Sequence, residues 1–232
     1  MGSRVVDPSA GASARVGIVT SPPGVLAGTV RFEGAPALTA AERAAVWVAA
    51  IPVDVPLGLP VNSQRSPVEG DGRFGLQGVH GRRVIRVEGL PAGWILSSVS
   101  QGGGDDPDAV IDVTNGRTLS DVGVLVARSA GALTGTVVDD TGAFLAGGAV
   151  LAFAADPTRW TYPSRFVRSA AVQPNGTFRV TGVPPGDYLV AHVATLKNGW
   201  DAPDSLHPLR DGATAVTVAP GRETPLAMKV SK

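Results

Sequence analysis

Histidine is the side chain best suited to acid–base and metal chemistry near neutral pH, and the sequence contains three. His80 lies in the segment GVHGRR, His192 lies near the end of DYLVAHV, and His207 lies in DSLHPLR. None of them belongs to a metal-binding spacing such as H-x-H or H-E-x-x-H, and the chain has no G-x-S-x-G nucleophile motif. We therefore interpret the three as surface or structural histidines, and we assign no catalytic residue.

Acidic side chains gather in one short segment, QGGGDDPDAVID, which contains Asp105, Asp106 and Asp108. Several carboxylates on one loop could bind calcium through their oxygens, but the glycine and terminal glutamate of an EF-hand are missing. Glycine and aspartate are also common turn formers. We expect a solvated turn between two strands, and we assign no metal ion or other cofactor. Calcium at this loop is the alternative.

An aromatic segment, RWTYPSRF, is the most unusual candidate for a binding surface. If the segment is a strand, Trp160 and Tyr162 place both rings on one face, near Arg165. Exposed rings beside polar groups bind sugars or peptides. Core packing is the stronger interpretation, because the chain has only four Trp, two Tyr and six Phe to fill its core. Trp200, in the predicted loop KNGWDAPD, is the fourth candidate and is expected to be partly exposed.

Charge and composition exclude several classes of function. The 232 residues contain 20 basic and 20 acidic side chains and no dense basic cluster, which argues against a nucleic-acid partner. The chain has no cysteine, so disulfides and thiolate chemistry are excluded. No apolar run is long enough to span a membrane, so we expect no membrane insertion. The 30 glycines and 19 prolines predict many turns between short strands.

The sequence repeats itself over a period of about a hundred residues. GTV occurs at 28–30 and again at 135–137, and DGRF at 71–74 matches NGTF at 175–178. LQGV at 76–79 likewise matches VTGV at 180–183. The join between the copies, VGVLVARSAGALTGTV, has a counterpart upstream in VGIVTSPPGVLAGTV. We therefore expect residues 16–19 to be the last strand of a preceding unit, and the natural protein to continue towards its amino terminus.

Within each copy the pattern is that of short strands. GTFRV alternates, with Phe178 and Val180 on one face and Arg179 on the other, as in a half-buried strand. Pro184, Pro185 and Gly186 predict a tight corner before the next strand. Such strands with frequent turns indicate a β-sandwich. Residues 39–47 are either a short helix, with Thr39 and Glu42 at the spacing of a capping box, or an insertion before a strand.

Two segments of the second copy, GTVVDDTGAFLAGGAV at 135–150 and NGTFRVTGVPPGDY at 175–188, resemble the carboxypeptidase regulatory-like domain. The first copy fits more loosely, because His80, Gly81 and Arg82 stand where the second has Pro-Pro-Gly. The resemblance implies an all-β fold of two tandem Ig-like, prealbumin-like β-sandwich domains. The predicted domains are 25–129 and 130–232, after a tail at 1–24 that includes the last strand of a missing repeat.

The resemblance also implies a context, since such domains occur in large bacterial secreted or surface proteins. We expect an extracytoplasmic, non-catalytic module that is structural or binds a glycan or peptide, and whose partners include upstream domains of the same polypeptide. The alternative is a weak hydrolase that uses a histidine with Asp or Ser at the interface between the two domains, where pockets tend to form.

Overall fold

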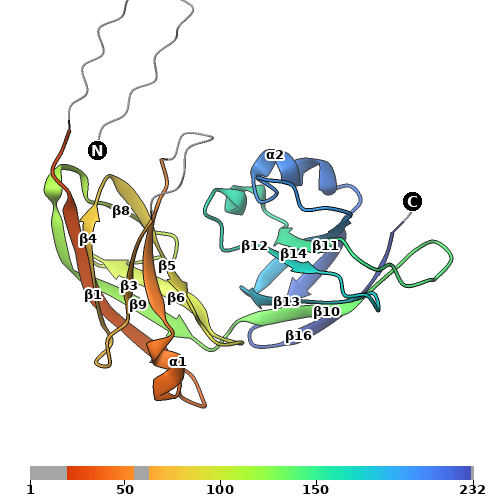
Figure 1. Ribbon diagram of the computed structural model, residues 1–232, viewed down its shortest axis with the longest axis horizontal. Coiled ribbons are helices and arrows are strands. Elements are labelled where there is room, and N and C mark those ends of the chain that lie inside the picture. The colour runs from red at the N-terminus through yellow and green to blue at the C-terminus, as the bar shows by residue number, and fades with distance from the viewer. Residues whose placement is uncertain (1–19, 55–62, 231–232) are drawn as a thin grey trace, which may run out of the picture. The chain divides into compact units, whose positions relative to one another are not determined.

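A computed structural model describes residues 20–54 and 63–230, and its architecture is all-β (Figure 1). The predicted β-sandwich fold class is confirmed. The chain divides into two compact units. Unit 1 comprises residues 1–32, 38–89 and 96–125, and unit 2 comprises residues 33–37, 90–95 and 126–232. The strand predicted at 16–19 lies outside the described residues.

Unit 1 is built from two sheets. The first has the strand order β4-β1-β9-β6-β7 and the second the order β3-β2-β5-β8. The strands and short helices are β1 (Gly24–Glu33), α1 (Ala40–Ala44), β2 (Trp47–Pro52), β3 (Gln64–Pro67), β4 (Arg73–Val79), β5 (Arg82–Glu88), β6 (Ile95–Gln101), β7 (Gly104–Asp105), β8 (Val110–Asp112), η2 (Thr114–Gly116) and β9 (Thr118–Ala127).

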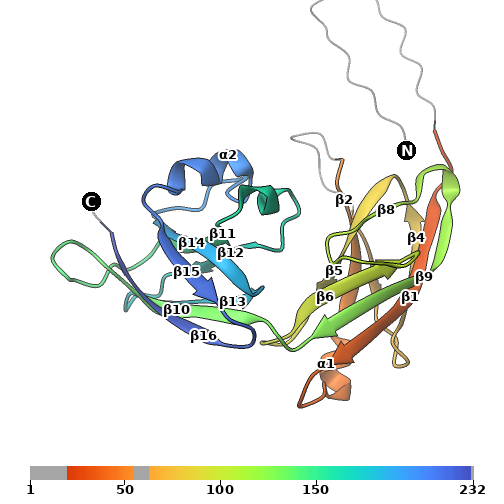
Figure 2. The same ribbon diagram turned by 180° about the vertical axis from the view of Figure 1, so that it is seen from behind.

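Unit 2 repeats the plan with a smaller first sheet. Its sheets have the orders β13-β10-β16 and β12-β11-β14-β15, and Figure 2 shows β15 and β16 from the side on which both labels are visible. The elements are β10 (Gly131–Val138), β11 (Ala149–Ala154), η3 (Pro157–Trp160), β12 (Val167–Ala171), β13 (Thr177–Val183), β14 (Gly186–Val193), α2 (Pro203–Leu206), η4 (His207–Leu209), β15 (Thr214–Val218) and β16 (Glu223–Lys229).

The core of unit 2 is supplied by the inner faces of both sheets. All six residues of β11 are buried, so this strand reads as a continuous apolar run. In β13 the burial alternates as predicted, with Phe178 and Val180 buried and Arg179 exposed. Tyr188 of β14 is buried as well, and its hydroxyl donates a hydrogen bond of 2.8 Å to the Pro184 carbonyl oxygen. The polar tip of the ring is thereby satisfied inside the core.

The corner between β13 and β14 differs from a simple hairpin. The two strands belong to different sheets, so Pro184 and Pro185 carry the chain across the sandwich. His80 and Gly81 do the same between β4 and β5 of unit 1. Gly81 has φ +70, a left-handed conformation that favours glycine. The corner therefore needs backbone geometry rather than one fixed sequence.

Of the two alternatives for residues 39–47, the structure has the short helix, α1. The Glu42 amide donates to the Thr39 hydroxyl at 3.2 Å, and the Thr39 amide donates to the Glu42 carboxylate at 2.8 Å. These reciprocal bonds are the predicted capping box. None of the helices within residues 20–54 and 63–230 has the length and apolar composition required to cross a membrane.

A close backbone approach closes the first sheet of each unit. A Cβ atom added to Gly28 would lie 1.8 Å from the Val122 carbonyl oxygen, and one added to Gly135 would lie 1.7 Å from that of Leu226. In unit 2 the contact joins the parallel pair β10 and β16. Any side chain at these two positions must push the first and last strands of the unit apart.

We predict that Gly135→Ala lowers the free energy of unfolding by about 1–3 kcal/mol, as overpacking of a closed contact does. Gly212→Ala is the matched control, because nothing lies within 4 Å of a Cβ there and its φ is not in the left-handed region. Chemical denaturation of both variants tests this. Equal stability of the two would show that β10 and β16 can separate without cost.

Candidate functional site

Four turns share one side-chain device, in which an Asp or Asn binds a threonine two residues later. In the Asp139 turn, the Thr141 amide and hydroxyl both donate to the same carboxylate oxygen, at 2.9 and 2.6 Å. The same pair of bonds occurs at Asp112 with Thr114, Asp156 with Thr158, and Asn175 with Thr177. The sequence pattern that predicts such a turn is D-x-T or N-x-T.

These bonds stabilise the ionised form of the acids. Hydrogen bonds from Thr114 hold the pKa of Asp112 below its ordinary value, and those from Thr158 do the same for the pKa of Asp156. A general acid or base works best with a pKa near the working pH. Both carboxylates are therefore turn-capping groups that stay charged, and neither is prepared for proton transfer at neutral pH.

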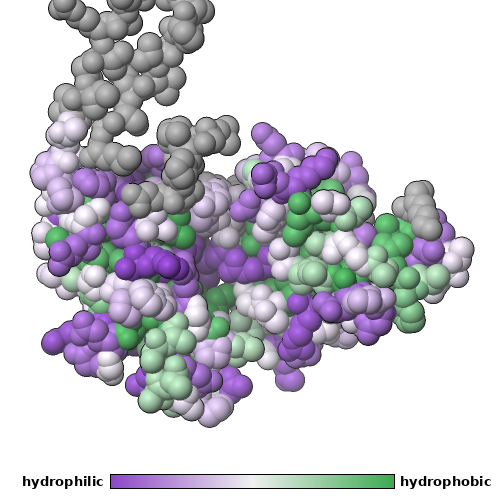
Figure 3. All heavy atoms as spheres, viewed as in Figure 1, coloured by the Kyte–Doolittle hydropathy of each residue, from purple (hydrophilic) through white to green (hydrophobic). Residues whose placement is uncertain are grey.

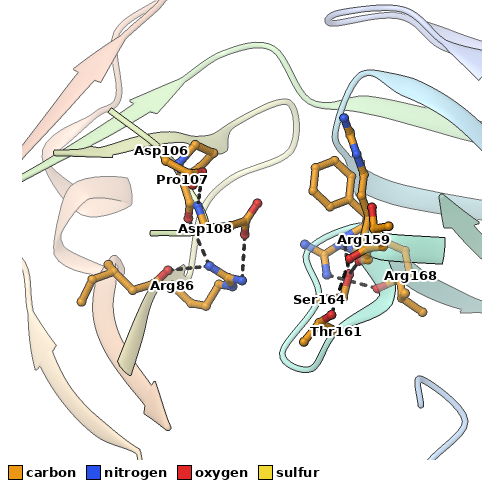
Figure 4. Close-up of polar contacts among 12 residues, drawn as sticks. Arg86, Asp106, Pro107, Asp108, Arg159, Thr161, Ser164 and Arg168 are labelled. Atoms are coloured by element: carbon orange, nitrogen blue, oxygen red, sulfur yellow. Dashed lines mark hydrogen bonds and ion pairs between the residues drawn. The ribbon is translucent and has the colours of Figure 1, made fainter. Parts of the chain in front are cut away.

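In the acidic loop of unit 1, two of the three candidate carboxylates engage the protein itself (Figure 4). Asp106 accepts a bond of 2.9 Å from the Asp108 amide, and Asp108 forms an ion pair of 2.9 Å with Arg86. Asp105 lies exposed in β7. Within the described residues, no three His, Asp or Glu side chains are arranged to hold a metal ion. A calcium ion at Asp108 would also have to compete with the Arg86 guanidinium.

The three histidines lie on different elements. His80 lies at the corner before β5, where desolvation is the largest cause that lowers its pKa and the charge of Arg83 is a smaller one. The His192 ring lies 3.2 Å from the Gly147 carbonyl oxygen through Nε2. The His207 ring packs edge-on against Trp160, with ring centroids 5.0 Å apart. Within unit 2, then, the contacts of His192 and His207 are with the scaffold.

The aromatic segment does not form the strand that was considered for it. Asp156 caps the 3-10 helix η3, and Pro157 occupies its first turn, so Trp160 turns inward and is fully buried. Its indole nitrogen donates 2.7 Å to the Ala154 carbonyl oxygen, and its ring packs edge-on against Phe153. As a correction to the candidate set, Trp160 is a core residue and offers no exposed platform.

Tyr162 keeps the surface role, since 41% of it is exposed. The same loop holds a cationic and aromatic cluster, in which the guanidinium carbons of Arg159 and Arg165 both lie 4.6 Å from the centre of the Phe166 ring. The Ser164 hydroxyl ties the loop together by donating to the Arg159 carbonyl oxygen at 2.5 Å (Figure 4). We call Arg159, Tyr162, Arg165 and Phe166 the Tyr162 surface.

Trp200 is half-buried and packs against the core of unit 2. It lies in a turn that its amide closes with the Lys197 carbonyl oxygen at 3.2 Å. On the face shown in Figure 3, apolar residues lie in small groups between polar ones. Of the four candidates for ligand binding, Tyr162 is exposed, Arg165 stacks on Phe166 in the same loop, Trp160 is buried in the core, and Trp200 contributes only a partial surface.

Comparisons with known proteins give little beyond the fold. No family model matches the sequence, and no curated protein matches it. Solved structures do match. The Bacillus anthracis TIE protein is 15% identical, with a TM-score of 0.27, over 91% of this chain and 33% of its own. The chain therefore spans one third of that protein's length.

Two pilins match over most of both chains. The minor pilin GBS52 of Streptococcus agalactiae is 14% identical, with a TM-score of 0.32, over 90% of this chain and 96% of its own. BcpA, the major pilin subunit of Bacillus cereus, is 13% identical, with a TM-score of 0.31, over 90% and 70%. At these identities and TM-scores, the matches say nothing about the function of this chain.

We predict that Thr158→Val raises the pKa of Asp156 towards its ordinary value, because it removes the hydroxyl bond, which is the largest cause of the lowered pKa, and leaves only the bond from the amide of residue 158. A lowered carboxyl pKa stabilises the fold above the ordinary pKa, and this contribution is lost as the pH falls through the lowered value. Titration of the Asp156 carboxyl carbon by NMR measures the change. Thr136→Val, in β10, is the control. If Asp156 titrated in Thr158→Val as in the unchanged chain, the Thr158 hydroxyl would not be the cause of its lowered pKa.

Proposed function

We propose that the chain is a non-catalytic tandem module of a bacterial extracytoplasmic protein, of the carboxypeptidase regulatory-like type, with the predicted domains 25–129 and 130–232. The observation that carries the proposal is the use of polar side chains. Carboxylates and threonines cap turns, as at Asp112 and Asp156, and other acids pair with arginines, as Asp108 does with Arg86. Such a molecule positions surfaces and does not move protons.

The Tyr162 surface is the proposed ligand-binding part of the module. Two guanidinium groups held against the Phe166 ring lose less freedom on binding than free side chains would. Arg donors beside an exposed Tyr ring are a combination that can bind the hydroxyl and ring groups of a glycan, or the backbone of a peptide. Upstream domains of the same polypeptide are the other proposed partners.

The hydrolase alternative has no observation in its favour among the described residues. It would place a histidine with Asp or Ser at a site shared by the two units. A panel of chromogenic esters, phosphates and glycosides tests it, together with His80→Ala, His192→Ala and His207→Ala. Turnover that disappears with one histidine would replace the non-catalytic proposal.

We predict that Tyr162→Ala weakens binding of glycans or peptides by about tenfold, the value of one aromatic contact of roughly 1.4 kcal/mol. Glycan and peptide arrays with the whole chain would find the ligand, and titration of the variants would locate it. Phe144→Ala is the matched control, because Phe144 is an aromatic residue of unit 2 that is 65% exposed. If no glycan or peptide on the arrays bound the chain, the ligand-binding role would be wrong and only the structural role would remain.

A further inference from the structure

The sheet edges of the two units are protected to different degrees. A strand at the end of a sheet has unpaired backbone groups that can recruit another strand. Within the described residues, four of the eight end strands face one another across sandwich corners. In unit 1, the Gly75 amide of β4 donates to Ser66 of β3 at 3.2 Å. In unit 2, Arg168 of β12 donates to the Gly182 carbonyl oxygen of β13 at 3.2 Å. The remaining ends are β7, β8, β15 and β16.

Both remaining ends in unit 1 are blunted by length and charge. Strand β7 has two residues and contains Asp105, and β8 has three residues and contains Asp112. Very short edge strands and charged side chains are common protections against strand addition. Neither edge offers an extended row of backbone donors and acceptors.

The edge of β16 is protected by a proline. The Ala132 amide donates to the Arg222 carbonyl oxygen, and the Val230 amide donates to that of Val138. Because alternate residues of a strand face the same neighbour, Val230 places the amides of Met228, Leu226 and Thr224 towards β10. The nitrogen of Pro225 therefore faces away from β10, where a proline removes the donor that an added strand would need.

Strand β15 has no charge and no proline of its own, although the hydroxyl of its Thr217 donates to the exposed carboxylate of Asp187 on β14 at 2.6 Å. Its sequence is Thr-Ala-Val-Thr-Val, five residues without a charge or a proline. The Ala155 amide donates to the Asp187 carbonyl oxygen, so Asp187 of β14 faces away from β15, and Tyr188 pairs with Val216 across the ladder. The amide and carbonyl groups of Ala215 and Thr217 consequently point away from β14. Both residues are exposed.

We propose that the outer edge of β15 binds an extended, uncharged peptide by strand addition. The four outward groups of Ala215 and Thr217 pair with the peptide backbone, and small or β-branched residues suit the exposed side chains of Thr214, Ala215 and Thr217. The proposal goes beyond the function proposed above, because it assigns a peptide to a surface separate from the Tyr162 surface.

The size of the edge favours a peptide over a second copy of the chain. Stable protein–protein interfaces bury about 1,200–2,000 Å². A five-residue edge supplies a small fraction of that area, whereas backbone pairing along one strand is the usual basis of peptide addition.

The test uses the whole chain and the peptide KGATAVTVAK, which is residues 212–219 with a lysine at each end for solubility. Amide NMR is expected to show shifted signals and slower hydrogen exchange at Ala215 and Thr217 when the peptide is added. Ala215→Pro, which places a proline at the outward position as in β16, is expected to weaken binding at least about tenfold, as for the loss of one hydrogen bond. Ala215→Val keeps the amide and is expected to bind like the unchanged chain.

A second arm leaves the protein unaltered. In two versions of the same peptide, N-methyl groups on alternate residues block the backbone donors of one peptide edge or of the other. The version methylated on the edge that would face β15 is expected not to bind. Peptide shifts confined to other strands, or equal binding by Ala215→Pro, would overturn the proposal. So would concentration-dependent changes at Ala215 and Thr217 without peptide, since a second copy would then occupy the edge. Tyr162→Ala is expected to leave this binding unchanged, which separates the two proposals.

Discussion

Both units depend on a contact in which the backbone of one strand meets a carbonyl group of another with no room for a side chain. Gly28 and Gly135 occupy equivalent places in the repeat, and each lies against a carbonyl oxygen of the last strand of its unit. Each glycine is also paired with the phenylalanine of the repeated motif, Phe74 or Phe178, on the opposite neighbour. The glycine brings the first and last strands together, and the phenylalanine fills the core beneath them. The repeated sequence is therefore explained by the closing of a sandwich.

On this common base, the units differ in the segment after the fifth strand of each. In unit 1 the chain adds β6 and β7 to the first sheet, beside β9. In unit 2 the corresponding stretch forms α2 and η4, where His207 and Arg210 contact the Trp160 ring. The buried tryptophan and the helical cover belong together, because the ring needs a covering layer that strands do not supply. One consequence is that β16 becomes an end strand, and it is there that the chain has Pro225.

The sequence predicted the features that local rules control. The alternation of Phe178 and Val180, the capping box of Thr39 and the turn-rich β-sandwich all follow from spacing and residue type. Trp160 is buried, in agreement with the stronger interpretation of its segment, but the sequence did not predict how, since its burial depends on Asp156 and Pro157 starting a 3-10 helix and on residues some fifty positions later. The corner at Pro184 was predicted as a turn, but which sheet receives the next strand depends on long-range pairing. The D-x-T turns could have been predicted from the sequence, because their hydrogen bonds join residues only two positions apart.

The hydrogen bonds of several carboxylates keep these groups charged near neutral pH. Catalytic carboxylates are usually found where burial or like charge raises the pKa towards neutrality. Here the resolved shifts run the other way: hydrogen bonds from Thr39 lower the pKa of Glu42, and those from Arg179 lower the pKa of Glu223. Acids held in this way remain fixed acceptors across the neutral range and keep loops and strand ends in place. The two surfaces proposed for a partner, the exposed Tyr162 with the arginines stacked on Phe166 and the outer edge of β15, rest on loops and strands that such bonds hold in place.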